Sequence, residues 1–289
     1  MTLLDSLIQG HPDDGMTLTT SSAEIVASRI LDNGARGVGA EVSTITVKDS
    51  TVGTNGQSGF VLNTSTLESF TSDVVANGDK GIDAINSTAS LSFTTVHDHP
   101  NDGVLLMNSA ASLEDSRVFD NAATGINAAN SVIAGLRSQL STNGKEGLVL
   151  AKSAADLNAS QLERNGAAAV RALSSKVSLT GALVADNGAD GFQLTSTQAT
   201  LTDTEVRANQ GAGISGKLRS RALLIDSLVE NHPASGILLE DSSTELQTSR
   251  LLGNGRSGIE AVNAAVKVME GRESSGHPAD GLKLVDGSA

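Results

Sequence analysis

Cysteine, tryptophan and tyrosine are missing from the 289-residue sequence, and proline and phenylalanine occur only four and five times. Without cysteine, the chain can form no disulfide framework, no thiolate nucleophile and no Cys-based zinc site. Aromatic residues make up only 2% of the chain, so its core must consist of many small aliphatic side chains. That composition suits a narrow core that is repeated many times.

Positive charge is also scarce, because 20 Lys and Arg face 33 Asp and Glu, for a net charge of −13. Nucleic-acid binding needs a basic stripe that neutralises phosphates, so we expect no nucleic-acid partner. No apolar run reaches the length of a membrane span, so we also expect no membrane insertion. The opening residues, MTLLDSLIQG, lack the basic and long apolar regions of a signal peptide.

A 22-residue repeat runs from one end of the chain to the other. Its marker is a glycine followed by an apolar residue, with one-residue insertions before Gly236 and Gly281, and Ala169 stands in the eighth copy. The marker glycines are Gly15, Gly37, Gly59, Gly81, Gly103, Gly125, Gly147, Gly191, Gly213, Gly236, Gly258 and Gly281. One frame over the whole length predicts a single domain, residues 1–289, without a linker.

Each repeat carries three short apolar–x–apolar segments separated by polar turns. One follows the marker, a second lies seven residues before it (Ile30, Val52), and a third lies near Ile25 and Val47. Strands this short cannot form a sandwich, but they can pair with their equivalents one repeat away. We therefore predict an all-β fold, a single right-handed parallel β-helix of about 13 coils with about 22 residues and three strands per coil.

Two polar rows mark the turns of the predicted coils. Nine asparagines stand four residues before the marker, and stacked amides can hydrogen bond from coil to coil. A hydroxyl row begins at Ser21, and we expect Arg219 to interrupt it. Seven of the nine asparagines precede glycine, whereas His11, His99, His232 and His277 take the same position before proline. If the glycines have positive φ, the His-Pro coils must turn differently and break the amide ladder.

Large and small apolar residues alternate three positions after the marker, as in Leu62, Ala84 and Leu106. Such alternation lets neighbouring layers interdigitate, so Ala84, Ala128 and Ala172 are expected to be fully buried. The residue before the marker tends to be acidic in alternate coils, as at Asp14, Asp102 and Asp190. The unit of duplication is therefore predicted to be 44 residues.

Segments such as DNGADGFQL (186–194) and GHPADGLKL (276–284) resemble the repeat of right-handed parallel β-helix proteins of the pectate-lyase-like superfamily. The resemblance covers nearly the whole chain. In particular, the repeats are similar to the repeat coils of alginate epimerases. It implies an extracellular or cell-surface location and a carbohydrate partner. Family enzymes usually carry Tyr or Trp, basic residues and long loops at the sugar cleft, all of which are missing or scarce here.

The best candidate site lies on one predicted sheet face, where three successive coils place outward residues side by side. These pairs are Asp73 with Val75, Thr95 with His97, and Arg117 with Phe119. In a catalytic interpretation, His97 or Arg117 would act as base or charge stabiliser and Asp73 would orient them. Thr95 and Phe119 would contact a saccharide. The alternative is an ordinary solvated face of mixed charge.

Metal chemistry has little support in the sequence. The four His-Pro histidines could form a metal or pH-sensing row, but most lie on coils too far apart to share an ion, which favours an alternative turn sequence. Acidic pairs such as Asp13 with Asp14, and Asp49 near Glu41, are scattered, so calcium stays possible without support and no cofactor is expected.

Two functions remain open. The first is a non-catalytic, extracellular structural or carbohydrate-contacting β-helix module with a polysaccharide as partner. The alternative is a polysaccharide lyase or uronan epimerase that acts on an acidic polysaccharide through Asp73, His97 and Arg117. Neither end shows an amphipathic helix or a polar closing segment. We therefore expect no dedicated caps, and either continuation in a longer β-helix or end-to-end association of rods.

Overall fold

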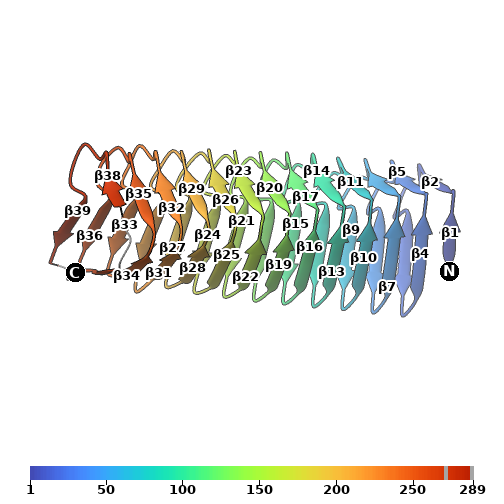
Figure 1. Ribbon diagram of the computed structural model, residues 1–289. Coiled ribbons are helices and arrows are strands. Elements are labelled where there is room, and N and C mark those ends of the chain that lie inside the picture. Colours follow the sequence, from blue (N-terminus) through green and yellow to red (C-terminus); the bar gives the residue numbers. More distant parts are fainter. Residues whose placement is uncertain (270–272, 287–289) are drawn as a thin grey trace. The chain divides into compact units, whose positions relative to one another are not determined.

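The computed structural model describes residues 1–269 and 273–286, and within them all regular structure is β-strand. Contacts divide the chain into two compact units, Met1–Lys145 and Glu146–Ala289. The strands fall into three recurring sets, which we name sheets A, B and C (Figure 1). One coil is a C strand, an A strand and a B strand in chain order. Within the described residues, no helix is long and apolar enough to cross a membrane.

In the first unit, the strands of each set pair in parallel with their equivalents in the neighbouring coils. Sheet A contains β1 (Thr2–Leu4), β4 (Ser22–Val26), β7 (Thr44–Lys48), β10 (Thr66–Phe70), β13 (Thr88–Ser92), β16 (Ala110–Glu114) and β19 (Val132–Leu136). Sheet B contains β2 (Leu7–Gln9), β5 (Arg29–Leu31), β8 (Thr51–Gly53), β11 (Asp73–Val75), β14 (Thr95–His97), β17 (Arg117–Phe119) and β20 (Gln139–Ser141). Sheet C contains β3 (Met16–Thr19), β6 (Val38–Glu41), β9 (Phe60–Asn63), β12 (Ile82–Ile85), β15 (Val104–Met107) and β18 (Ile126–Ala129).

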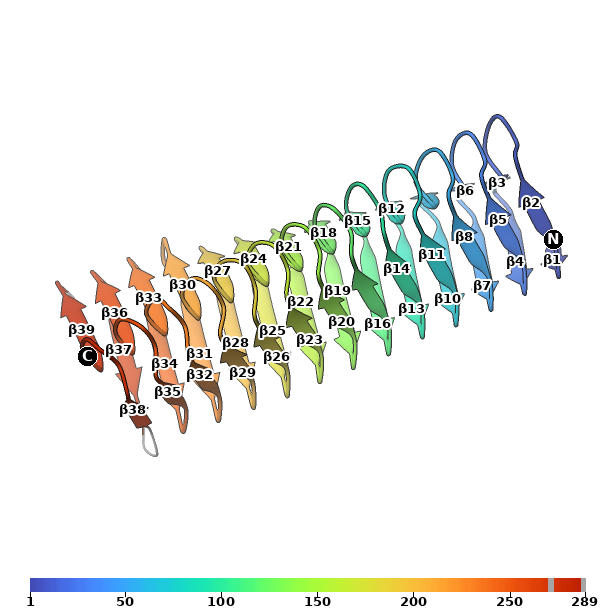
Figure 2. The same ribbon diagram turned by 90° about the horizontal axis from the view of Figure 1, so that it is seen from above.

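The second unit repeats this arrangement, and Figure 2 shows its equivalent strands following one another in chain order. Its A strands are β22 (Ala154–Asn158), β25 (Lys176–Thr180), β28 (Gln198–Thr202), β31 (Arg221–Ile225), β34 (Ser243–Gln247) and β37 (Ala265–Val268). Its B strands are β23 (Gln161–Glu163), β26 (Leu183–Ala185), β29 (Glu205–Arg207), β32 (Leu228–Glu230), β35 (Arg250–Leu252) and β38 (Glu273–Ser275). Its C strands are β21 (Leu148–Ala151), β24 (Val170–Leu173), β27 (Phe192–Thr195), β30 (Ile214–Lys217), β33 (Ile237–Glu240), β36 (Ile259–Val262) and β39 (Leu282–Val285). The predicted parallel β-helix with three short strands per coil is therefore confirmed.

The core of each unit is a stack of thin aliphatic layers. Ala84 is fully buried, and its partners in the neighbouring coils are Leu62 and Leu106. Ala128 and Ala172 are buried to the same degree, as the alternation of large and small residues predicts. A small residue between two leucines leaves room for the larger side chains to interdigitate.

Changing Ala84 to Leu should overpack this layer, because neither adjacent leucine can move toward solvent. We expect the free energy of unfolding to fall by about 1–3 kcal/mol. Urea unfolding followed by circular dichroism measures it, since the chain has no Trp or Tyr for fluorescence. Ala110, on the outward side of β16, gives the matched control, and Ala110→Leu should change stability little. Equal effects of the two changes would mean that the layer is loosely packed.

The marker glycines are required by close approach between coils. A Cβ atom on Gly59 would lie 2.7 Å from the amide nitrogen of Asn77, and one on Gly81 would lie 2.8 Å from the imidazole of His99. The glycines after the ladder asparagines are required for the same reason, since a Cβ on Gly56 would clash with the carbonyl oxygen of Gly34. A side chain at Gly56, Gly59 or Gly81 would therefore push the neighbouring coils apart.

The asparagine ladder continues through the histidines. The side-chain oxygen of Asn77 accepts the backbone N–H and the amide N–H of Asn55, and its own amide donates to the carbonyl of Val52. At the next coil, the imidazole of His99 accepts the backbone N–H of Asn77 and donates to the carbonyl of Val74. The two imidazole nitrogens thus replace the oxygen and nitrogen of an amide.

The expected difference between Asn-Gly and His-Pro turns is wrong. Positive φ among the described glycines occurs at Gly10, Gly181, Gly253 and Gly276, and not at Gly34 or Gly56. The ladder therefore has no need of a left-handed glycine, and a proline with its fixed negative φ is compatible with the same turn. In the Asn-Gly turns, the backbone N–H of Gly56 or Gly78 donates to the carbonyl of the asparagine one coil before. Pro100 has no N–H and therefore lacks this one hydrogen bond.

The hydroxyl row is also continuous at the place where Arg219 was expected to break it. The extra residue of this coil gives two successive left-handed residues, Leu218 and Arg219, and Ser220 then takes the row position. Its hydroxyl accepts the backbone N–H of Thr197. The insertion is therefore absorbed in the turn before the row.

The acidic alternation has a local explanation. Oδ1 of Asp14 accepts the backbone N–H of Arg36, Asp102 accepts that of Thr124, and Asp190 accepts that of Ala212. Each acid thus satisfies a turn N–H one coil later in the chain. The acidic residues of the alternate coils therefore have a structural role in the turns.

Candidate functional site

The candidate site lies on the outer side of three sheet B strands, β11, β14 and β17, in the first unit. The register places Asp73 beside Thr95, Thr95 beside Arg117, and His97 beside Phe119. The middle residues of the strands, Val74, Val96 and Val118, point into the core. We call the outward group of Asp73, Thr95, His97, Arg117 and Phe119 the His97 face.

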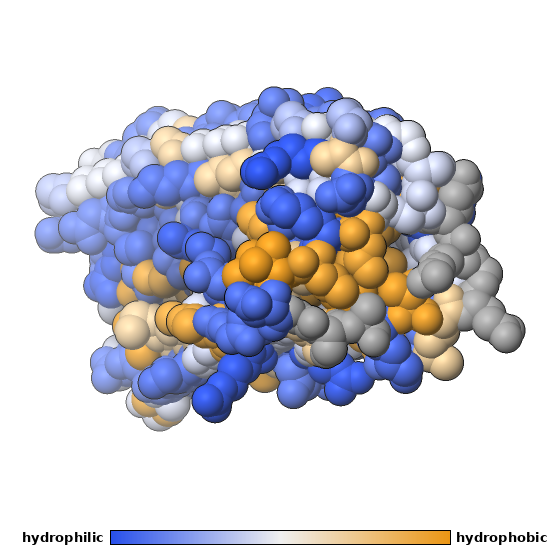
Figure 3. Space-filling model, turned by 90° about the vertical axis from the view of Figure 1, so that its left-hand side faces the viewer, coloured by the Kyte–Doolittle hydropathy of each residue, from blue (hydrophilic) through white to orange (hydrophobic). Residues whose placement is uncertain are grey.

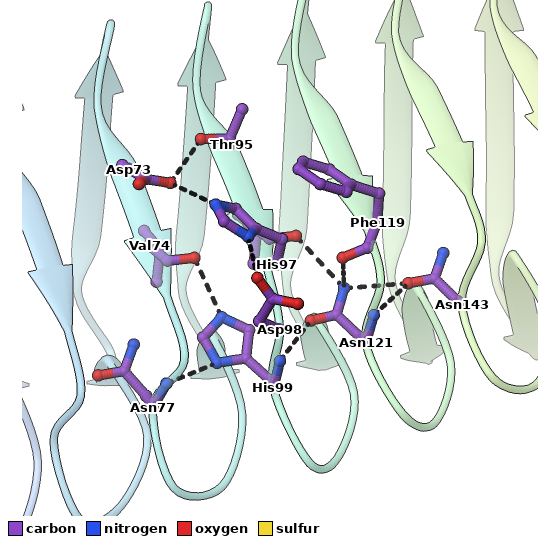
Figure 4. Close-up of polar contacts among 11 residues, drawn as sticks. Asp73, Val74, Asn77, Thr95, His97, Asp98, His99, Phe119, Asn121 and Asn143 are labelled. Atoms are coloured by element: carbon purple, nitrogen blue, oxygen red, sulfur yellow. Dashed lines mark hydrogen bonds and ion pairs between the residues drawn. The ribbon is translucent and has the colours of Figure 1, made fainter.

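His97 is held on both ring nitrogens by carboxylates (Figure 4). Its Nε2 lies 2.9 Å from Asp73 Oδ1, and its Nδ1 lies 2.7 Å from Asp98 Oδ2. Thr95 donates its hydroxyl proton to the same Asp73 oxygen over 2.6 Å. The imidazole is therefore fixed in orientation, and neither nitrogen keeps a free lone pair.

His97 and Asp73 each stabilise the charged form of the other. The hydrogen bond to Asp73 raises the pKa of His97, with a smaller contribution from Asp98, and outweighs the opposing effect of burial. Burial raises the pKa of Asp73, but the bonds from His97 and Thr95 outweigh it and lower that pKa overall. The two carboxylates therefore stabilise the protonated form of His97.

Phe119 forms the apolar part of the face. Its ring stacks on the imidazole of His97, with centroids 4.6 Å apart and planes 13° from parallel. The guanidinium carbon of Arg117 lies 4.4 Å from the centroid of the same ring, and its Nε donates to the side-chain oxygen of Gln139. A protonated imidazole and a guanidinium are both attracted to the π system, so Phe119 ties the charged groups together.

The neighbouring histidine has a different character. His99 is 1% exposed, and burial lowers its pKa to about 4. Nδ1 accepts the N–H of Asn77, so the proton must sit on Nε2, which donates to Val74. His232 makes the same contacts with Asn209 and Val206 in the second unit. His99 and His232 are therefore better described as turn residues that replace asparagine than as members of a metal-binding row.

The acidic pairs considered for calcium do not form a cation site, because their members pair with other side chains or lie at different corners. Asp14 forms an ion pair with Arg36 over 2.5 Å. Glu41 ends β6, whereas Asp49 lies at the next corner, beyond strand β7. Across residues 1–269 and 273–286, no group of three His, Asp or Glu side chains is placed to hold a metal ion.

Two hollows lie in the second unit, away from these charged groups. The larger, of about 1060 Å³, is an open groove along a corner that includes Leu218, Arg219, Asp241 and Asn263. The smaller, of about 330 Å³, is lined by Leu246, Leu251, Ile259, Val268 and Leu282.

Apolar side chains gather on the side of the molecule that Figure 3 shows. End-to-end association stays a prediction.

Comparison with known proteins supports the architecture. A family profile described as right handed beta helix region matches residues 102–250, more than half of the chain. The chain belongs to the right-handed β-helix family. No curated protein sequence matches it.

Solved structures of the same fold include several carbohydrate-active proteins. The mannuronan C-5 epimerase AlgE4 A-module of Azotobacter vinelandii aligns with 100% of this chain and 90% of its own, at 12% identity and a TM-score of 0.56. The periplasmic alginate epimerase AlgG aligns with 93% and 76%, at 11% identity and 0.53. The catalytic domain of a GH87 alpha-1,3-glucanase aligns with 91% and 63%, at 12% identity and 0.59. At these identities the likeness shows the β-helix fold alone.

Two features of this β-helix protein were not predicted from its sequence. Asp98, the second partner of His97, lies just beyond β14 with a φ of 59°. Aspartates recur at this position in Asp32, Asp120 and Asp186, which is a signal of a left-handed corner that tolerates Asp. A second hydroxyl row also exists, in which Ser28 accepts the N–H of Ser6 and Ser50 accepts that of Ser28. Its 22-residue spacing was sufficient to find it.

Proposed function

We propose that this chain is a carbohydrate-contacting β-helix module of an extracellular or cell-surface protein, with the His97 face as its contact site. One observation carries the proposal: the Asp73 and Asp98 carboxylates, held in place by His97, and the Arg117 guanidinium form a preorganised set of hydrogen-bond acceptors and donors on an outer sheet face. Sugar hydroxyls need both kinds of partner, and fixed partners lower the entropy cost of binding. The fold it shares with alginate epimerases and a glucanase is consistent with such a ligand.

Binding without turnover is the favoured form of this function. A general base must offer a free lone pair to the proton that it removes. Both nitrogens of His97 already face carboxylates, and the raised pKa of His97 favours the protonated ring. Arg117 is occupied by Phe119 and Gln139. The alternative, a lyase or uronan epimerase, would have to break these contacts before acting.

We expect the chain to bind at least one polysaccharide in a panel of alginate, pectate, α-1,3-glucan, β-glucan and mannan, measured by calorimetry. Changing His97 or Phe119 to Ala should weaken that binding about tenfold or more, because the charged groups lose their common anchor. Gln161→Ala is the matched control, since Gln161 takes the Arg117 position two repeats later.

The same panel separates binding from catalysis. Ultraviolet absorbance of unsaturated products detects a lyase, and the uronate composition of recovered polymer detects an epimerase. Turnover that is lost in His97→Ala would establish the enzymatic alternative. No binding to any member of the panel would refute a carbohydrate role for this face.

A further inference from the structure

Phenylalanine is distributed unevenly over the surface. Phe60 and Phe192 are fully buried, whereas the other three lie outward on three successive coils of the first unit. Phe70 ends β10, Phe93 follows β13, and Phe119 ends β17. Because neighbouring coils pair in register, the three positions trace a diagonal. It runs from the outer side of sheet A, across the corner, to the His97 face.

Phe93 occupies a position that the fold makes unfavourable for it. The corner between sheets A and B holds a left-handed residue in coil after coil, and φ is 48° at Thr71, 51° at Phe93 and 48° at Asp115. This conformation costs a non-glycine residue about 1–2 kcal/mol, which Asp can partly recover through local hydrogen bonds. Phenylalanine cannot recover it in that way, and 62% of Phe93 is exposed, so little burial compensates.

Phe93 also differs from Phe119 in its surroundings. The ring of Phe119 is engaged by His97 and Arg117. Among the residues that the structure describes, Phe93 has neither an aromatic nor a cationic partner. Phe70, at 37% exposure, lies one coil before it. An open aromatic ring offers a flat apolar surface on which the C–H face of a sugar ring can stack.

The charges around the diagonal select against an acidic polymer. Glu68 and Asp73 lie along it on sheets A and B, and Asp98 and Asp120 lie beside it, just beyond β14 and β17. The cations near the path are already engaged. Arg117 lies over Phe119 and donates to Gln139, and Lys48, beside Phe70, pairs with Glu24 over 2.9 Å. Arg137 pairs with Asp115 over 2.6 Å and with Glu114 over 3.1 Å. A polyuronate would meet carboxylates along this path, in a chain whose net charge is already −13.

On the basis of the function proposed above, we infer that the ligand is a neutral polysaccharide. Its sugar rings stack on Phe70 and Phe93, and the chain continues diagonally onto the His97 face. Because the diagonal spans two coil spacings of about 4.8 Å each as well as the corner, the ligand must contain several sugar units. Monosaccharides reach only one part of the path.

The test is calorimetric titration of the whole chain with oligosaccharides of increasing length. The probes are α-1,3-gluco-, cello- and manno-oligosaccharides, with oligomannuronates as the acidic counterpart. We expect affinity for one neutral series to rise with length and the oligomannuronates to bind at least tenfold more weakly. Phe93→Ala should weaken binding of the long neutral oligosaccharides about tenfold and leave that of the shortest unchanged. Folding should not suffer, because Ala27 and Ala159 occupy the same corner in other coils.

Thr248→Ala, at the same corner in the second unit, is the control and should change nothing. Equal or tighter binding of oligomannuronates, or unchanged long-chain binding in Phe93→Ala, would overturn the inference. If His97→Ala still abolished binding in that case, the proposed contact site would stand without this aromatic path. Absence of binding to every probe would reject both.

Discussion

Acidification from pH 7 to pH 4 should destabilise the first unit by about 3 kcal/mol through His99 alone. Burial lowers the pKa of His99 in the folded chain from 6.5 to about 4. Above pH 6.5 both states are neutral and the pKa difference has no effect. Between pH 6.5 and 4 only the unfolded chain binds the proton, so stability falls by about 1.4 kcal/mol for each unit of the difference. Below pH 4 the folded state also binds it, and the loss stops growing.

His99→Asn should remove this contribution while keeping the ladder intact. An asparagine at this position can accept from Asn77 and donate to Val74, as Asn121 does one coil later toward Val96. Urea unfolding at pH 7 and pH 4, followed by circular dichroism, gives the difference between variant and wild type. His11→Asn is the control, because His11 precedes proline in the same way but is exposed. The same pH dependence in His99→Asn and wild type would show that His99 is not the titrating group.

The coil could be predicted because the 22-residue period allows only one pairing register between the strands of neighbouring repeats. A strict 22-residue repeat aligns each apolar–x–apolar segment with its equivalent, so a slip would place core residues in solvent. Ala84 and the outward pairs of the His97 face both follow from that phase. Corner conformations were harder to predict, because left-handed φ also occurs at Thr71 and Phe93, which are not the residue types that normally signal it.

The contacts within the site depend on side-chain directions that a repeat does not encode. The sequence places Asp73, Thr95 and His97 on one face, but it does not show that both imidazole nitrogens meet carboxylates. Asp98 lies next to His97 in sequence, and in a regular strand the two side chains would point to opposite faces. The left-handed turn at Asp98 brings its carboxylate back to the ring, which occupies the second nitrogen of His97 and raises the pKa of the imidazole.

The phenylalanines show the same limit. Phe119 was selected because it occupies an outward strand position, whereas Phe93 lies in a turn, where strand periodicity does not apply. Its exposure became visible only with the corner geometry. The repeat therefore predicts what is common to all coils. The candidate function depends on the few coils that differ.

Replacing Asn77 with Ala should have the largest effect on stability, about 3–5 kcal/mol. The asparagine is fully buried, and its oxygen accepts two N–H groups of Asn55 while its amide satisfies the carbonyl of Val52. Alanine would leave the backbone N–H of Asn55 buried without its acceptor, at a cost of about 1–3 kcal/mol, and would also remove the amide bonds to Asn55 and to the carbonyl of Val52. A cavity adds to the loss.

Two further variants show whether the ladder bonds are the cause. Asn101→Ala removes an exposed amide that donates only to Asp79 among the described contacts, and it should change stability by less than about 0.5 kcal/mol. Asn77→His should recover much of the stability at pH 7, because an imidazole can accept from Asn55 and donate to Val52 as His99 does one coil later. Most of the recovery should disappear at pH 4, because the unfolded chain then binds a proton that the buried ring excludes, as for His99. If Asn77→Ala unfolds at the same urea concentration as wild type, the ladder contributes no net stability and the coils are held by the core and the strand pairing alone.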